Sequence, residues 1–139
     1  MYQLNSMEPN YWLSLSSLSY LLPSYIAYSI GYTYLGVLYI VLTTISVIYH
    51  STKIPSLLLI DIPVSHINHI LSFLIIIKGG FISISLYLSW LLYTLYSYYY
   101  GYQTSSLIWH KDPEKSTPWH AGLHVLTSLI TSITLVLSS

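Results

Sequence analysis

Three histidines and one aspartate in this sequence have the residue types and the spacing of a metal site. His120 and His124 are four residues apart, so on a helix they lie one above the other, where two imidazoles can bind one ion. A third neutral imidazole, His50, would leave a tetrahedral zinc ion (Zn2+) with one open position. Asp61 lies in the apolar run 54–77, where a carboxylate is costly unless a cation is near.

The composition indicates that a membrane protein must position these groups. Only 6% of the 139 residues are charged, against roughly 25% in soluble domains, whereas 54% are hydrophobic. So few charges cannot cover the large surface of a soluble domain of this size. The formal net charge is zero, which excludes a nucleic-acid partner bound through phosphate neutralisation. The chain has no cysteine, so it has neither disulfides nor thiolate metal ligands.

Five stretches are long and apolar enough for membrane-spanning helices, each of which needs about 20 residues. They run over residues 12–31, 33–50, 54–77, 81–100 and 118–137. Lys78-Gly79-Gly80 is a turn signal between the third and fourth stretches. We therefore predict one all-α domain over residues 1–139, a bundle of about five transmembrane helices in a multi-pass integral membrane protein.

Two prolines affect the first and the last of the predicted helices. Pro23 is expected to kink the first helix, because it lacks the backbone N–H of a regular helical bond. Ser116 or Thr117 followed by Pro118 is a good helix start, which predicts that the last helix begins there. The one substantial loop is then 101–117.

Polar residues recur at helical spacing in three of the five stretches. In lipid, such stripes must face other helices or a water-filled cavity. The stripes are Tyr39, Thr43, Ser46 and His50; Asp61, Ser65, Asn68 and Ser72; and His120, His124, Thr127, Thr131 and Thr134. Hydroxyls commonly bond backbone carbonyls in membrane helices, which explains the serines and threonines but not the ionisable groups. The stripes predict a bundle with a polar interior.

The alternation of five spans predicts where the ionisable groups meet. His50 ends the second stretch, Asp61 lies early in the third, and His120 and His124 lie near the start of the fifth. These positions share one side of the membrane, so the four groups converge on one shallow layer. Ser46 lies one turn before His50 on the same helix face.

The remaining histidines have simpler interpretations. His66 is about 140° around the helix from Asp61, which places it on another face. His69 shares the face of Asp61 but lies about two turns deeper, where we expect it to bond another helix or line the cavity. His110, beside three charged residues, is expected to be a solvated loop residue.

Three features together resemble a known family. Ser46 precedes His50 by one turn, the segment 50–64 reads HSTKIPSLLLIDIPV, and the segment 120–129 reads HAGLHVLTSL. This set resembles the alkaline ceramidases and, more widely, the superfamily of membrane hydrolases that includes the adiponectin receptors. These families have a seven-helix core. The chain thus resembles a shortened core, whose missing wall would open the cavity to lipid or require a second copy in a homo-oligomer.

The resemblance implies both an activity and the residues that perform it. His50, His120 and His124 would bind zinc, Asp61 would position and deprotonate a zinc-activated water, and Ser46 would hydrogen-bond near the metal and the substrate carbonyl. The implied partner is a membrane lipid: ceramide, hydrolysed to a sphingoid base and a fatty acid, or another acyl lipid such as a phospholipid.

Two hypotheses from other classes stay open at this point. Six histidines in a helical bundle could ligate haem, with His50 and His120 as the two axial ligands. The chain could also be a non-catalytic scaffold or lipid receptor that keeps a structural zinc ion. Bound metal distinguishes haem from zinc, and lipid hydrolysis distinguishes an enzyme from a scaffold.

Overall fold

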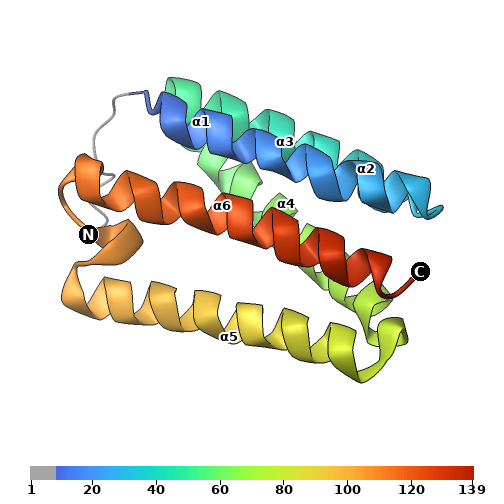
Figure 1. Ribbon diagram of the computed structural model, residues 1–139. Helices are drawn as coiled ribbons and strands as arrows, with labels where there is room; N and C mark the ends of the chain where they lie inside the picture. Colours follow the sequence, from blue (N-terminus) through green and yellow to red (C-terminus); the bar gives the residue numbers. More distant parts are fainter. Residues whose placement is uncertain (1–8) are drawn as a thin grey trace.

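Helices make up nearly all of the chain that the computed structural model describes, which is residues 9–139 (Figure 1). In chain order the elements are α1 (Tyr11–Ser17), η1 (Leu18–Tyr20), α2 (Leu21–Ser29), α3 (Thr33–Thr52), α4 (Pro55–Ile76), η2 (Ile77–Gly79), α5 (Gly80–Thr104), η3 (Leu107–Trp109) and α6 (Pro113–Val136). The prediction of an all-α protein is confirmed.

Local sequence explains where the central helices end. Lys53 ends α3 in the left-handed conformation, with φ 55°, and its N–H bonds the Tyr49 carbonyl at 2.7 Å. Pro55 then begins α4 at a position where its missing N–H costs nothing. The turn before α5 uses Gly80 at φ 76°, a conformation that glycine adopts without strain. A Cβ atom on the neighbouring Gly79 would overlap Ser138, so this turn packs against the end of the chain.

The first predicted span forms a rod of two helices, α1 and α2, which is interrupted close to the predicted kink. A 3-10 turn, η1, separates α1 from α2 and ends three residues before Pro23. Proline at this position cannot donate to the carbonyl of Ser19, four residues earlier, so the regular α-helical pattern is lost there.

The predicted start of the last helix is wrong. The helix α6 begins at Pro113, because Asp112 caps it by accepting a hydrogen bond of 3.0 Å from the N–H of Glu114. Pro118 lies inside α6, where it removes a single backbone bond near the helix end. Because α5 also continues to Thr104, the loop predicted over 101–117 is confined to residues 105–112.

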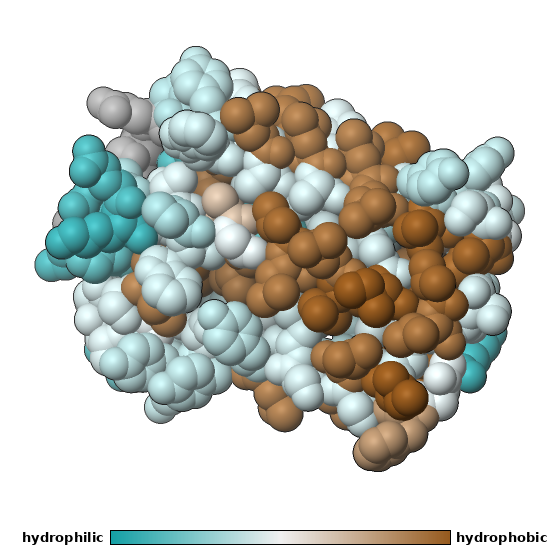
Figure 2. Space-filling view, in the orientation of Figure 1, coloured by the Kyte–Doolittle hydropathy of each residue, from teal (hydrophilic) through white to brown (hydrophobic). Residues whose placement is uncertain are grey.

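The outside of the bundle is apolar. Within residues 9–139, three stretches are long and apolar enough to cross a membrane: Thr33–Thr52, Pro55–Trp109, which contains both α4 and α5, and Pro113–Val136. On the face shown in Figure 2, strongly apolar side chains gather over the middle and the right, and the most hydrophilic ones lie at the left-hand end. Among the described residues, buried polar side chains outnumber buried apolar ones. The chain is a multi-pass membrane protein.

Packing around α3 and α6 brings the polar stripes inside. The rod formed by α1 and α2 contacts both α3 and α6, α4 packs on α3, and α5 packs on α6 (Figure 1). The buried stripe of α3 includes Tyr39, whose hydroxyl is 2.8 Å from that of Ser72 in α4. Buried threonines and His124 line the inner face of α6. The predicted polar interior is confirmed, and it places the ends of α1, α3 and α6 side by side.

Candidate metal centre

His50, His120 and His124 meet at one end of the bundle. One nitrogen from each ring lies within 4.8 Å of the other two. The centroid of the His50 ring is 5.2 Å from that of His120 and 5.4 Å from that of His124. The centroids of the His120 and His124 rings are 4.7 Å apart. His50 and His124 are buried and His120 is half-buried. Residues seventy positions apart in the chain thus form one compact cluster, as the sequence predicted.

The three rings come from two helices, α3 and α6. His50 lies in the last turn of α3, and the two others lie one turn apart on α6. Aromatic rings flank the cluster: Tyr49 packs on His50 with centroids 5.0 Å apart, and Tyr20 packs on His124 at 5.5 Å. These contacts restrict the imidazoles to few orientations.

Asp61 lies beside the cluster but is not part of it. Its half-buried carboxylate interacts with the Ser46 hydroxyl, on the adjacent helix α3. Within residues 9–139, its Oδ1 atom is buried without a hydrogen-bond partner. Ser46 in turn lies 3.0 Å from Ser17, measured between the two Oγ atoms. The structure therefore connects the predicted acid to the histidines through hydroxyl groups.

Serines of the rod formed by α1 and α2, which were not predicted as site residues, also contact the cluster. The Oγ atoms of Ser16 and Ser17 lie 2.9 Å and 3.3 Å from Nδ1 of His124. Ser19 donates to the backbone carbonyl of His124 at 3.2 Å. The only signal in the sequence was the density of serines in this stretch. Their role depends on α1 lying between α3 and α6, which a single helix pattern does not reveal.

The start of α1 is tied to both other helices at this end. The backbone N–H of Asn10 donates to the carbonyl of His50 at 2.8 Å. The Asn10 side chain donates to the hydroxyl of Thr117 at 2.7 Å, and its oxygen caps α1 by accepting from the N–H of Leu13 at 3.1 Å. One residue therefore fixes the positions of α1, α3 and α6 around the cluster.

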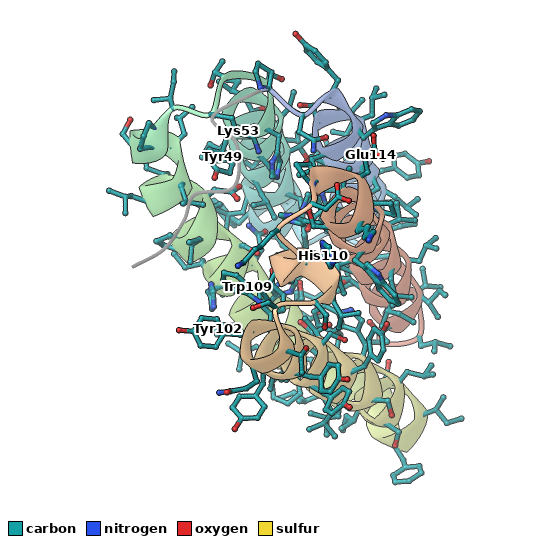
Figure 3. The ribbon with its side chains drawn as sticks, turned by 90° about the vertical axis from the view of Figure 1, so that its left-hand side faces the viewer. Tyr49, Lys53, Tyr102, Trp109, His110 and Glu114 are labelled. Carbon is teal, nitrogen blue, oxygen red and sulfur yellow. The ribbon has the colours of Figure 1, made fainter. Side chains whose placement is uncertain are left out.

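Lys53 lies next to Tyr49 at the cluster end of the bundle (Figure 3). Its ammonium lies 3.5 Å from Nδ1 of His50 and 5.2 Å from the centroid of the Tyr49 ring. Within the described chain, no carboxylate forms an ion pair with it. Burial lowers the pKa of this ammonium below its usual value. The cluster thus has a cationic group at its edge.

The other histidines do not join the cluster. His66 is exposed and donates from Nδ1 to the carbonyl of Ile62 at 2.7 Å. His69 bonds another helix, as expected: the Tyr87 hydroxyl of α5 donates to its carbonyl at 3.1 Å. His110 lies in the loop before α6, where its Nδ1 accepts from the N–H of Asp112 at 3.0 Å (Figure 3).

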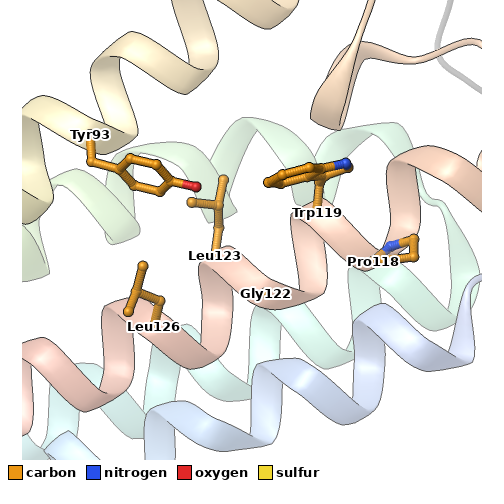
Figure 4. A pocket seen from close by; sticks show the side chains of 6 residues that line it. All are labelled: Tyr93, Pro118, Trp119, Gly122, Leu123 and Leu126. Carbon is orange, nitrogen blue, oxygen red and sulfur yellow. The ribbon is translucent and has the colours of Figure 1, made fainter.

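A groove of about 410 Å³ lies between α5 and α6 (Figure 4). Its lining is mostly apolar and consists of Tyr93, Pro118, Trp119, Gly122, Leu123 and Leu126. At 100° per residue, Gly122 and Leu126 lie on the opposite side of α6 from the two histidines. The groove therefore faces the surroundings of the bundle and not the histidine cluster.

The donor set of the cluster suits a metal ion. Imidazole nitrogens bind zinc at 2.0–2.1 Å, so three ligands of a tetrahedral ion lie roughly 3.3 Å apart. Nitrogens already within 4.8 Å of one another reach that spacing by small side-chain rotations. Three imidazoles leave one position open, and the unpartnered oxygen of Asp61 in the neighbouring layer is a group that a cation or its water would satisfy.

Compared with known proteins, the chain matches no family, no curated protein and no solved structure. The functional evidence is therefore the cluster itself and its setting in a membrane bundle.

Proposed function

We propose that this protein is a zinc-dependent intramembrane lipid amidase of the alkaline ceramidase type, which hydrolyses ceramide to a sphingoid base and a fatty acid. The observation that carries the proposal is the convergence of His50, His120 and His124 inside an apolar-surfaced bundle. In this proposal the rod formed by α1 and α2 crosses the membrane together with α3, α4, α5 and α6, and these five spans form a shortened version of the seven-helix core.

The residues divide the reaction between them. Zinc bound to the three imidazoles would supply Lewis acidity and activate water at the open position. Asp61 takes the proton of the attacking water on its unpartnered oxygen and delivers it to the leaving nitrogen. The carbonyl carbon gains the water oxygen as the C–N bond breaks, so the products are a carboxylic acid and an amine. Ser46, whose hydroxyl interacts with the Asp61 carboxylate, would orient this residue near the metal and the substrate carbonyl.

The depth of the site supports a lipid substrate. His50 lies in the last turn of α3, whereas His120 and His124 are the eighth and twelfth residues of the 24-residue helix α6, so the cluster is level with the end of one span. A lipid amide or ester at the headgroup boundary reaches this depth while its acyl chains remain in the hydrocarbon region. Ceramide and phospholipids share this geometry, so a panel of both identifies the bond that is cleaved.

The geometry favours an ion over haem. A haem needs two imidazoles on opposite faces of a porphyrin plane. Here the three rings contact one another, with centroids 4.7–5.4 Å apart, which leaves no room for a macrocycle between any two.

The test combines metal analysis with hydrolysis on the same purified sample. We expect one zinc ion per chain and release of fatty acid from ceramide. Asp61→Asn should keep the zinc and lower the rate at least about 100-fold, because general acid–base catalysis contributes 10²–10⁴-fold. Asp112→Asn is the matched control, since asparagine caps α6 as well as aspartate does. It should leave both quantities unchanged.

Three outcomes would contradict the proposal. Failure to bind zinc would remove the metal site. An Asp61→Asn variant as active as the wild type would remove the proposed base. Zinc binding without hydrolysis of any lipid in the panel would identify a scaffold with a structural ion.

A further inference from the structure

Two hydroxyl groups of the first rod surround one nitrogen of the histidine cluster. Nδ1 of His124 lies 2.9 Å from Oγ of Ser16 and 3.3 Å from Oγ of Ser17. Ser17 is fully buried, His124 is 7% exposed and Ser16 is half-buried, so these contacts are largely shielded from water. The tautomer of His124 therefore depends on which partner donates the proton.

The hydrogen-bond inventory of the two serines decides this question. A hydroxyl has one proton to donate. Ser16 donates to the Leu13 carbonyl at 2.9 Å, and Ser17 donates to the same carbonyl at 2.8 Å. Both oxygens consequently present lone pairs to His124. Two acceptor oxygens then face Nδ1, which favours the tautomer with the proton on that nitrogen.

This proton has a direct consequence for the cluster. An imidazole protonated on Nδ1 has its free lone pair on Nε2, the nitrogen that remains for an ion. The other tautomer would direct an N–H group at the ion position. Histidine ligands in metal sites are usually fixed in this way by an outer partner of the second nitrogen.

We propose that Ser16 and Ser17 are positioning residues of the metal site, which hold His124 in the Nδ1–H tautomer and fix the direction of its Nε2 lone pair. The metal-binding part of this inference rests on the proposed function. Ser17 also lies 3.0 Å from the hydroxyl of Ser46, the residue that interacts with Asp61. The first rod therefore couples the metal ligand to the proposed base.

The first test measures zinc affinity by competition with a fluorescent chelator. Ser16→Ala combined with Ser17→Ala should weaken zinc binding 10–100-fold, the usual effect of removing an outer partner of a ligand. Ser16→Thr combined with Ser17→Ala keeps one hydroxyl and should recover most of the affinity. Ser14→Ala is the matched control. Ser14 is buried on the same helix and bonds Ser51 at 2.9 Å, so its removal should change zinc affinity less than about twofold.

The second test reads the tautomer directly in the metal-free protein. Nitrogen NMR of ¹⁵N-histidine-labelled wild type in micelles should show His124 neutral with its proton on Nδ1. The signal is assigned by its loss in His124→Gln. In the double alanine variant this preference should weaken toward a mixture of tautomers. If that variant does not fold, Ser16→Ala alone should weaken zinc binding to a smaller extent.

The outcomes separate this inference from the proposed function. A proton on Nε2 in the wild type, or unchanged zinc affinity in the folded double variant, would overturn the role of the serines. Absence of zinc binding in the wild type would overturn the metal site instead, while the NMR result would still decide the tautomer.

Discussion

The two ends of the bundle use similar residues in different ways. Each end has a lysine over a tyrosine ring: Lys53 lies 5.2 Å from Tyr49 at the cluster end, and Lys78 lies 5.8 Å from Tyr32 at the opposite end. Both ends also join helices through serine hydroxyls. The difference is in how the polar groups are satisfied.

At the opposite end, serine hydroxyls bond backbone carbonyls and contact each other. Ser83 donates to the carbonyl of Thr134 at 3.0 Å and lies 2.9 Å from the hydroxyl of Ser138. Ser138 also donates to the Thr134 carbonyl, at 2.6 Å. These bonds join α5 to α6 and satisfy the groups that form them. They are sufficiently explained by helix packing in lipid.

At the cluster end, the hydroxyls instead support groups that remain available. Ser16 and Ser17 orient His124, and Ser46 contacts Asp61, whose Oδ1 has no partner among the described residues. Buried polar atoms without partners are costly, and in native proteins they point to an ion, water or catalytic role. Buried polar atoms without a hydrogen-bond partner among the described residues also occur away from the cluster, for example in Asn68 and Ser132. Asp61 differs from these because its unpartnered atom belongs to an ionisable carboxylate, which Ser46 connects to the end of the bundle that holds the three histidines.

The largest expected effect comes from removing an imidazole. His124→Ala should weaken zinc binding more than about 100-fold, since losing a direct ligand exceeds the 10–100-fold effect of losing its outer partner. His69→Ala is the control, because His69 is a histidine of the bundle that packs on Trp90, with centroids 5.1 Å apart. It should leave zinc affinity unchanged in calorimetric titration. Equal losses in both variants would mean that neither histidine is specific to the metal.

Zinc should also stabilise the folded protein. A ligand that binds only the folded state at 100 times its Kd stabilises it by ~2.7 kcal/mol. We expect thermal unfolding in micelles to shift upward with zinc and to return with a chelator. His50→Ala should abolish the shift, whereas Ser83→Ala should lower the melting temperature and retain it. A zinc-induced shift that persists in His50→Ala would place the ion elsewhere.

Much of this arrangement could be predicted from the sequence, because hydropathy and helical spacing are local. The apolar helices from α3 to α6 and the polar stripes follow from the cost of exposing polar backbone and side chains to lipid, and the turn at 78–80 follows from its glycines. The first predicted span, 12–31, is instead divided into α1, η1 and α2 and is not among the stretches long and apolar enough to cross a membrane. The meeting of His50 with His120 and His124 followed from counting spans. These inferences needed no knowledge of how helices rotate against one another.

The rest depended on competition between alternatives that the sequence does not rank. The last helix begins at Pro113 and not at the predicted Pro118, because Asp112 caps the earlier start. Ser16 and Ser17 became part of the site only because α1 packs between α3 and α6. A serine in a membrane helix has many partners within reach, so its role emerges from tertiary packing.

A smaller effect should follow from Gly79→Ala at the opposite end. The added Cβ would overlap Ser138, so the turn and the chain end must separate. Overpacking of this kind costs about 1–3 kcal/mol. We expect lower stability in detergent denaturation with unchanged zinc affinity, whereas Gly122→Ala, whose Cβ would meet open space, should retain full stability. A change in zinc affinity in Gly79→Ala would show that the two ends are coupled.

The smallest effect distinguishes the two lysines. Lys53→Met and Lys78→Met should each lose a cation–π contact of about 0.5–1 kcal/mol in stability. Only Lys53 lies beside the cluster, 3.5 Å from the His50 ring nitrogen, so its charge repels a bound dication. Removing it should raise zinc affinity about fivefold, equivalent to ~1 kcal/mol of repulsion at high dielectric constant.

Salt provides the control for this last prediction. Repulsion between partly solvated charges is screened as ionic strength rises, so the difference between the two methionine variants should shrink from low salt to 1 M salt. A loss of packing would persist at both salt concentrations. If Lys53→Met lowers zinc affinity, the ammonium supports the site through its contact with His50 and does not repel the ion. Lys53 would then have a structural role, like the polar contacts at the opposite end of the bundle.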